Sequence, residues 1–303
     1  MNLPAAIRSP SPYLLLVFPP LFWAGNFVLG RAVRADIPPF ALSFWRWTVA
    51  LIILLPFVLP HMRAQRTLLR AHFGRLLVLS VLGVASYNTL AYIGLQQTTA
   101  TNAVLMVSTT PVLIVGVSFL LLRQTIHLWQ GLGILVSLAG VAAIVLKGDL
   151  TSLLQQQLNP GDFWIFAAGV SWAGYSVLLV KWRPTGLHPL SFLGFTIAFG
   201  VLAILPLYLW DWLIRGHGFI PGPVTLGSIG YVAVFPSVLA YIFWNRAVTE
   251  LGANRCGQFL HLMPAFGTVL SWLLLGERLY AYHWLGIGLI AAGIYLATML
   301  GRR

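Results

Sequence analysis

Two versions of one segment occur in this chain: residues 100–140 read ATNAVLMVSTTPVLIVGVSFLLLRQTIHLWQGLGILVSLAG, and residues 253–293 read ANRCGQFLHLMPAFGTVLSWLLLGERLYAYHWLGIGLIAAG. Aligned at a constant offset of 153 without a gap, they share eleven identities in 41 positions, including Pro111 with Pro264. Both copies are apolar, so some identity follows from composition, but the shared proline and glycines constrain the backbone itself. An apolar segment duplicated together with its proline is typical of a transporter built from internal repeats.

The composition is that of an integral membrane protein. Of the 303 residues 59% are hydrophobic and 8% are charged, whereas a soluble domain carries about 25% charged residues. The net charge of +12 does not indicate a nucleic-acid-binding protein, because the basic residues lie between apolar stretches. The single cysteine, Cys256, excludes a disulfide framework and a thiolate metal cluster, and we expect neither a cofactor nor a metal.

Hydropathy predicts an all-α integral membrane protein with ten transmembrane helices, each near the ~20 residues needed to cross a bilayer. The predicted spans are 12–30, 39–60, 74–95, 101–122, 128–146, 162–180, 187–210, 226–249, 254–276 and 281–300. Pro206 interrupts the seventh span, which is the least regular. We expect one structural domain made of two five-helix repeats, 1–150 and 151–303.

Lysine and arginine predict the orientation. With both termini in the cytoplasm, eleven of these residues fall on the cytoplasmic side and five on the other, and this bias favours that arrangement. The five on the other side are Arg31, Arg34, Lys147, Arg215 and Arg278. Because each half has an odd number of spans, the second half enters the membrane from the opposite side, so the repeat is inverted and alternating access can follow.

Several short motifs carry a resemblance to a known family. Trp23-Ala24-Gly25-Asn26 in span 1 is echoed by Trp172-Ala173-Gly174-Tyr175 in span 6. The second half also holds the motifs Tyr241 to Asn245, Leu251-Gly252-Ala253-Asn254-Arg255, Leu262-Met263-Pro264 and Leu275-Gly276-Glu277. In order and spacing the chain resembles the drug/metabolite transporter superfamily, in particular its EamA-type ten-helix exporters. The first half departs at Arg123-Gln124, where the second half has Gly276-Glu277.

The resemblance implies a fold and a function. The fold would be two inverted five-helix repeats around a central cavity, lined by spans 1, 3, 4, 6, 8 and 9, with spans 5 and 10 packed at one side. The function would be export of small metabolites, with amino acids prominent, across the bacterial cytoplasmic (inner) membrane. It implies no enzymatic activity and no catalytic residue.

Polar side chains inside spans are costly and therefore mark candidate site positions. In span 1 Trp23 and Asn26 lie about one turn apart on one face, and Trp172, Tyr175 and Ser176 repeat the pattern in span 6. Recurrence in both halves favours cavity lining over an aromatic belt at the interface, although the tryptophans fit either interpretation.

Spans 3 and 8 carry a second matched set, Tyr87, Asn88 and Tyr92 in the first and Tyr241, Trp244 and Asn245 in the other. The offset of 153 pairs Asn88 with Tyr241 and Tyr92 with Asn245, so the same residue types share a face in swapped order. Two interpretations stay open. One is hydrogen bonding between helices, and the other is a substrate site with aromatic walls and amide anchors.

Three basic residues, Arg46, Arg246 and His261, lie several residues inside spans. Arg46 and Arg246 can reach an interface by extending their side chains, or they can act as counter-charges for a substrate carboxylate. His261 is either a satisfied polar contact or a cavity residue whose charge responds to pH.

The matched Pro111 and Pro264 each remove a backbone hydrogen bond, which predicts hinges in spans 4 and 9. The acidic residues fall at span ends or in loops, and proton-driven carriers usually hold a carboxylate at membrane depth. We therefore expect a secondary exporter of amino acids or similar metabolites without obligatory proton coupling. The alternatives are a drug or metabolite exporter with proton coupling, an intramembrane enzyme, and a receptor that does not transport. The expected partners are a small-molecule substrate and the lipid bilayer, with no nucleic acid; a monomer is plausible, and the sequence does not determine the oligomeric state.

Overall fold

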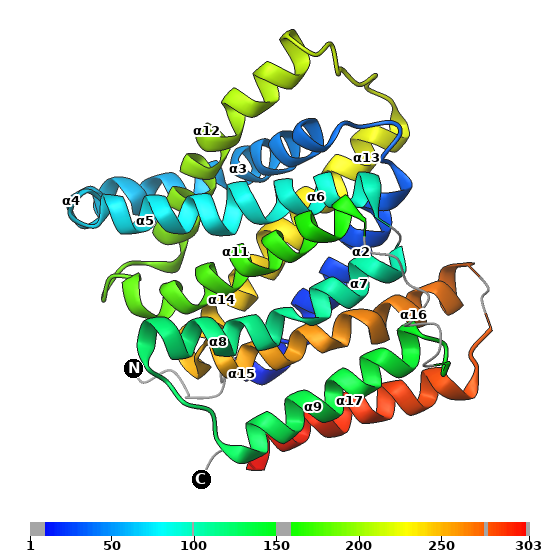
Figure 1. Cartoon of the computed structure of the whole chain (residues 1–303). Coiled ribbons are helices and arrows are strands. Elements are labelled where there is room, and N and C mark those ends of the chain that lie inside the picture. The colour runs from blue at the N-terminus through cyan, green and yellow to red at the C-terminus, as the bar shows by residue number, and fades with distance from the viewer. Residues whose placement is uncertain (1–9, 99, 150–158, 276–277, 301–303) are drawn as a thin grey trace, which may run out of the picture.

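A computed structural model describes residues 10–98, 100–149, 159–275 and 278–300, and in these ranges every regular element is a helix (Figure 1). The helices of the first half are α1 (Pro12–Leu15), α2 (Phe18–Ala32), α3 (Pro39–Ala64), α4 (Arg66–Ala71), α5 (Phe73–Ser80), η1 (Val81–Ser86), α6 (Tyr87–Gln97), α7 (Ala100–Ser108), α8 (Thr110–Leu122) and α9 (Leu128–Val145). The helices of the second half are α11 (Pro160–Trp182), α12 (Pro189–Leu213), α13 (Pro223–Val232), η2 (Ala233–Leu239), α14 (Ala240–Leu251), α15 (Ala253–Gly257), η3 (Gln258–His261), α16 (Leu262–Leu275) and α17 (Ala281–Met299).

Ten membrane-crossing segments follow one another along the described chain. Nine of them are long and apolar enough to cross a membrane as helices. The remaining one, span 9 (predicted at 254–276), is divided into α15, the 3₁₀ turn η3 and α16. Pro206 lies inside α12 without ending it, so the seventh span is more regular than expected. The predicted repeat boundary at 150/151 lies outside the described residues.

Proline starts many of these helices. α1, α3, α11, α12 and α13 begin with a proline at the first position, where the missing N–H group costs no hydrogen bond and the fixed φ suits a helix. These prolines thus mark in the sequence where the helices begin.

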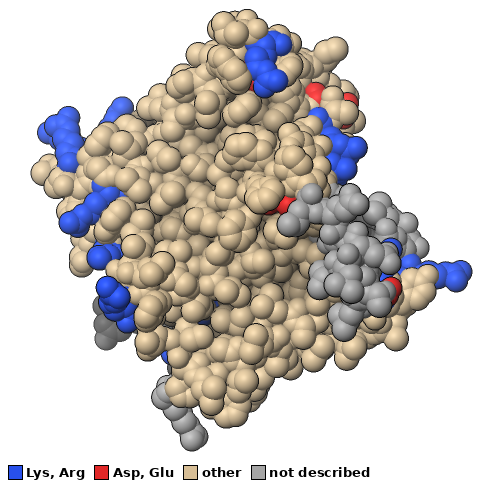
Figure 2. Space-filling model, viewed as in Figure 1, with Lys and Arg blue, Asp and Glu red and all other residues tan. Residues whose placement is uncertain are grey.

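The surface between the two ends of the molecule is apolar. Figure 2 shows lysine and arginine gathered at opposite ends of the face in view, with a mostly uncharged surface between them. Large apolar side chains on this surface are exposed, including Ile52 (63%), Leu120 (68%) and Leu135 (65%). Such an apolar band around a helical bundle is what a bilayer covers, and the chain is a multi-pass membrane protein.

The fifth and tenth spans, α9 and α17, pack against each other at one side of the bundle (Figure 1). A Cβ atom added to Gly133 would lie 2.5 Å from the carbonyl oxygen of Gly293, and one added to Gly140 would lie 2.6 Å from that of Gly286. The repeat offset relates Gly133 to Gly286 and Gly140 to Gly293, so each contact is the repeat image of the other. This exchange is what an approximate two-fold axis between inverted repeats produces.

Matched π-helices interrupt spans 3 and 8. They are η1 and η2, and the repeat offset places Val81–Ser86 on residues 234–239. Each lies directly before the helix that carries one of the matched polar sets. Isolated π-helical turns in α-helices frequently occur at functional sites. The sequence analysis missed them because hydropathy does not distinguish a π-helix from an α-helix.

Candidate functional site

Four aromatic side chains from three spans form a buried cluster at the centre of the bundle. Trp23 of α2, Trp172 of α11, and Tyr241 and Trp244 of α14 are each at most 2% exposed. The ring centroid of Trp23 lies 5.0 Å from that of Trp172, 6.4 Å from that of Tyr241 and 5.4 Å from that of Trp244. The structure therefore brings together the tryptophans of both repeats.

Further predicted residues surround this aromatic cluster. The ring of Tyr87 lies 4.8 Å from that of Trp172. The Tyr175 hydroxyl donates to Asn245 Oδ1 at 2.6 Å. Trp244 Nε1 donates to Ser176 Oγ at 3.2 Å. These polar groups satisfy one another in the bundle interior, as buried polar groups must.

Arg46 of α3 lies beside the aromatic cluster and is fully buried. Its Nη1 donates to Asn88 Oδ1 at 2.8 Å and to the Tyr92 hydroxyl at 2.6 Å, with a longer contact of 3.3 Å to Asn26 Oδ1. Its Nε donates to Ser237 Oγ at 2.9 Å. The guanidinium thus joins α2, α3 and α6 of the first half to η2 of the second half.

The positive charge of Arg46 has no anionic partner in the described part of the chain. All four hydrogen-bond partners are neutral, and the ion pairs found there involve Asp211 and Glu250 only. The second terminal nitrogen, Nη2, is buried without a hydrogen bond. One of the two sequence interpretations had Arg46 extend to an interface. Its guanidinium lies in the interior instead. A buried, unpaired guanidinium is costly, and an incoming carboxylate would remove that cost.

The two π-helices supply matched acceptors to the aromatic cluster. The Tyr241 hydroxyl donates to the carbonyl oxygen of Gly83 in η1, and Trp23 Nε1 donates to that of Pro236 in η2 at 3.0 Å. Gly83 and Pro236 are equivalent by the offset of 153. Sequence reasoning missed both residues, and it also missed Ser237 and Trp47, whose ring centroid lies 4.9 Å from that of Tyr241. Carrying the offset of 153 from Asn88 back to residue 83 would have paired the glycine with the proline.

His261 lies apart from the aromatic cluster, between η3, α9 and the end of α7. Its Nε2–H donates to the Ser108 carbonyl oxygen at 3.1 Å, and its Nδ1 lies 2.6 Å from Ser137 Oγ. Both ring nitrogens are therefore satisfied and the residue is fully buried. Ser137 is also fully buried and packs against Gly293, so this serine–histidine pair is enclosed by the helices around it.

The matched prolines lie where spans 4 and 9 break. α7 ends at Ser108 and α8 begins at Thr110, so Pro111 lies in the first turn of α8. Pro264 lies in the first turn of α16, directly after the 3₁₀ turn η3. The breaks are at equivalent places in the two repeats, and their role as hinges stays a prediction.

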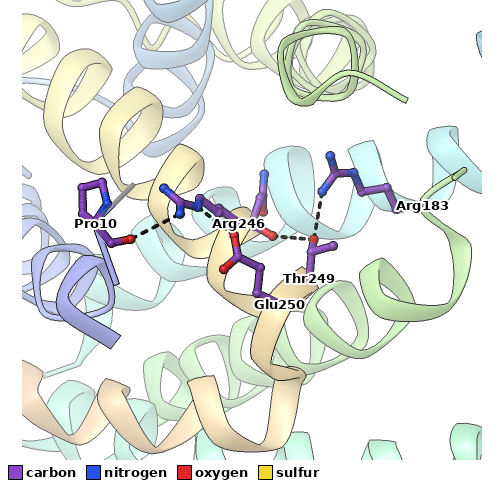
Figure 3. A network of polar contacts seen from close by, with 6 residues as sticks. Pro10, Arg183, Arg246, Thr249 and Glu250 are labelled. Atoms are coloured by element: carbon purple, nitrogen blue, oxygen red, sulfur yellow. Dashed lines mark hydrogen bonds and ion pairs between the residues drawn. The ribbon is translucent and has the colours of Figure 1, made fainter. Parts of the chain in front are cut away.

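Two cavities of about 360 Å³ each lie at opposite ends of the bundle. One lies between α11, α12 and α14 and is lined by Asn245 of the central site, together with Arg183 and Arg246. Figure 3 shows Arg246 between the Pro10 carbonyl (3.2 Å) and Glu250 (2.8 Å) at its edge. Arg246 is thus paired with an acidic residue, unlike Arg46, and it lies outside the aromatic cluster.

The second cavity lies at the other end, between α2, α7 and α16. One face of α2 lines it with Ala24, Phe27 and Arg31, while Trp23 and Asn26 of the same helix point into the central site. Helix α2 is therefore the wall between this cavity and the aromatic cluster.

Comparisons with known proteins agree with this architecture. The chain is 26% identical to "Uncharacterized transporter YyaM" of Bacillus subtilis (strain 168) over 286 residues, which cover 94% of this chain and 93% of the relative. It is 30% identical to "Uncharacterized transporter YetK" of the same organism over 272 residues, 90% of this chain and 82% of the relative. A solved structure titled "Crystal structure of protein" has the same fold, with a TM-score of 0.74 at 20% identity over 96% of this chain and 98% of that one.

The family itself is shown by its sequence model, which matches twice. The model of the EamA-like transporter family covers residues 10–146 and again residues 159–299, so each match takes one half of the chain. The two matches agree with the two inverted five-helix repeats of the fold. The chain belongs to the EamA-like transporter family and is a membrane transporter.

Proposed function

We propose that this transporter exports small metabolites that carry a carboxylate group, amino acids or similar compounds, across the bacterial inner membrane by alternating access. The observation that carries the proposal is the buried Arg46 guanidinium, whose Nη2 has no partner, beside a cluster of aromatic rings. Such a site offers a cation for a carboxylate and apolar walls for the rest of the solute.

The placement of the cavities supports alternating access. With both termini in the cytoplasm, the cavity at Asn245 opens to the cytoplasm and the cavity at Arg31 opens to the outside. The central site lies between them and is closed to both, because its rings and Arg46 are buried. Rocking of one repeat against the other would expose Arg46 to each side in turn. We expect three kinds of element to move: the π-helices that contain Gly83 and Pro236, the helix breaks at Pro111 and Pro264, and helix α2.

A matched set of solutes tests the charge requirement. Tryptophan, indole-3-propionate and tryptamine share the indole ring and differ in the groups that carry charge. Purified protein in liposomes should transport the first two and leave tryptamine untransported, because only they supply a carboxylate to Arg46. The same measurement on other amino acids identifies the natural side chain.

The variants Arg46→Gln and Arg46→Lys complete the experiment. Arg46→Gln should lower transport at least ~100-fold, since it removes a charge-assisted bond worth roughly 3 kcal/mol in the interior. Arg46→Lys should keep part of the activity. Transport of tryptamine at the rate of indole-3-propionate, or normal transport by a folded Arg46→Gln variant, would show that the proposal is wrong.

A further inference from the structure

A cationic rim surrounds the mouth of the cavity between α2, α7 and α16. Arg31 at the end of α2, Lys147 after α9 and Arg278 before α17 all line it, and His283 of α17 lies beside them. The body of the cavity is apolar, with side chains such as Phe27, Val107 and Met263. No acidic side chain is among the described residues that line it. The cavity therefore combines an apolar interior with a positively charged entrance.

The position of these charges is not explained by membrane topology. The rule that places lysine and arginine in the cytoplasm disfavours them at this end, which holds only five of these residues in the predicted orientation. Three of the five line this one cavity, and they come from three separate places in the sequence. Arg34 and Arg215, the other two, do not line it.

The rim is also held in place locally. Arg31 Nη1 donates to the carbonyl oxygen of Leu95 at the end of α6, at 2.7 Å, which holds the guanidinium at the edge of the cavity. Lys147 has a positive φ of 54°, a conformation that few residues other than glycine adopt and that turns the chain sharply after α9. These features position charge at the entrance of the cavity.

We propose that this cavity is a second binding site, which takes a small organic anion with an apolar body and holds it at the outer end of the export path. The apolar body enters between α2, α7 and α16, and the carboxylate stays at the rim near Arg278 and Lys147. The volume of about 360 Å³ suits one small solute. The position of this second site on the export path rests on the proposed function, whereas binding of the anion at the rim does not.

A cysteine inside the cavity can measure the local potential directly. Thr268 of α16 lines the cavity, and Thr268→Cys is nearly isosteric. The natural Cys256 is fully buried, so it gives little background labelling. The rate of labelling by an anionic methanethiosulfonate (sulfonatoethyl) is compared with that by a cationic one (trimethylammonium-ethyl). Ile220→Cys, 86% exposed at the same end, gives the reference ratio.

We expect the anionic reagent to be favoured about tenfold at Thr268→Cys relative to the reference, because a cationic entrance concentrates anions. Adding Arg278→Gln and Lys147→Asn should remove most of this preference; asparagine tolerates the positive φ of Lys147. The matched control, Arg34→Gln with Arg215→Gln, removes the same charge from the same end and should leave the preference unchanged. A preference no larger than the reference would overturn the proposal.

Protection from labelling tests the ligand itself. Indole-3-propionate should slow labelling of Thr268→Cys, and this protection should be lost in the rim variant but kept in the control variant. Equal protection by tryptamine, or protection by phosphatidylglycerol in place of the small acid, would overturn the proposal. In an Arg46→Gln background protection should persist although transport is lost. Normal protection with no transport by any variant would therefore reject the proposed function alone, and transport without protection would reject this second site alone.

Discussion

Asn88 Nδ2 donates a long hydrogen bond of 3.4 Å to the Tyr241 hydroxyl, and these two residues are equivalent positions of the two repeats, 153 residues apart. Ser108 and His261, also 153 apart, are joined by a hydrogen bond of 3.1 Å. A residue can contact its own repeat equivalent only near the axis that relates the repeats. The central site therefore lies close to the approximate two-fold axis, where motion of the repeats against each other changes the contacts most directly.

The first prediction concerns the hydroxyl of Tyr241. Tyr241→Phe keeps the ring in the aromatic cluster but leaves the Gly83 carbonyl without its donor and Asn88 without its acceptor. We expect a loss of about 1–3 kcal/mol in stability and at least ~tenfold slower transport, measured by thermal unfolding and by liposome flux. Tyr208→Phe is the control, since its hydroxyl lies outside the site and accepts from Trp45 at 3.3 Å. Equal transport by the two variants would make Tyr241 a packing residue only.

The second prediction concerns the packing of α9 on α17. Gly140→Ala would place a methyl group 2.6 Å from the Gly286 carbonyl oxygen, so the helices must separate, at a cost of about 1–3 kcal/mol. Gly288→Ala in α17 meets no heavy atom within 4 Å and should be neutral or slightly stabilising, because alanine favours the helix. Thermal unfolding of the two variants measures the difference. The same unfolding temperature for both would show that the glycine contact is not tight.

The fold was predictable from the sequence because its signals are local or repeated. Apolar stretches gave the spans, and the constant offset identified the matched glycines and the equivalence of Asn88 and Tyr241. That these equivalent positions come into contact is a finding of the structure. The break between α15 and α16 was harder to predict from the sequence, since a 3₁₀ turn such as Gln258–His261 leaves hydropathy unchanged.

Some residues of the candidate site were predictable from the sequence, but their arrangement was not. The recurrence of Trp23 and Trp172 identified two rings that the structure places 5.0 Å apart. The direction of Arg46 was not predictable, because its depth in a span, roughly 10 Å from Pro39, fits either an interface or the interior. Which face of α3 turns inward depends on packing against η2, and thus on a segment 191 residues away.

The third prediction concerns orientation in the membrane. Thr67→Cys and Thr185→Cys, both exposed, should be labelled only from the cytoplasmic side, whereas Ile220→Cys should be labelled only from outside. The physical reason is the distribution of lysine and arginine between the two ends. Membrane-impermeant maleimide on intact cells and on inverted vesicles checks this. Labelling of Thr67→Cys in intact cells would reverse the topology and exchange the two cavities.

The fourth prediction concerns acid pH at the end of the bundle where α3 ends and α12 begins. The rings of His61 and His188 stack with centroids 4.0 Å apart. Desolvation, followed by the nearby His61 and Arg183, lowers the pKa of His188 from its ordinary value of 6.5. Because the folded pKa is the lower one, the unfolded chain takes up the proton first, and stability falls as the pH drops below about 6.5.

His188→Asn tests this pH dependence without removing the helix cap. The His188 ring accepts from the backbone N–H of Leu190 at the start of α12, and asparagine is also a good N-cap residue. The decrease in unfolding temperature between pH 7.5 and pH 5 should be smaller in the variant than in the natural protein. The effect should be small, since His188 is exposed. An unchanged decrease would assign the pH dependence to other groups.

The last prediction concerns energy coupling. Coupled transport needs a site whose protonation is linked to solute binding. The two buried carboxylates among the described residues lie at helix ends, Asp162 in the first turn of α11 and Asp211 near the end of α12. His261 is the remaining candidate, but it is fully buried and bonded to Ser108 and Ser137, away from the aromatic cluster. We therefore expect solute to move down its own gradient in liposomes without any imposed pH or voltage difference. His261→Gln should lower stability by about 1–3 kcal/mol, because it leaves buried partners unsatisfied, and should keep this downhill flux. The measurement is flux with and without a pH gradient in the natural protein and in the variant. If flux requires the gradient and the substitution removes that requirement, His261 is a coupling residue and uncoupled transport is rejected.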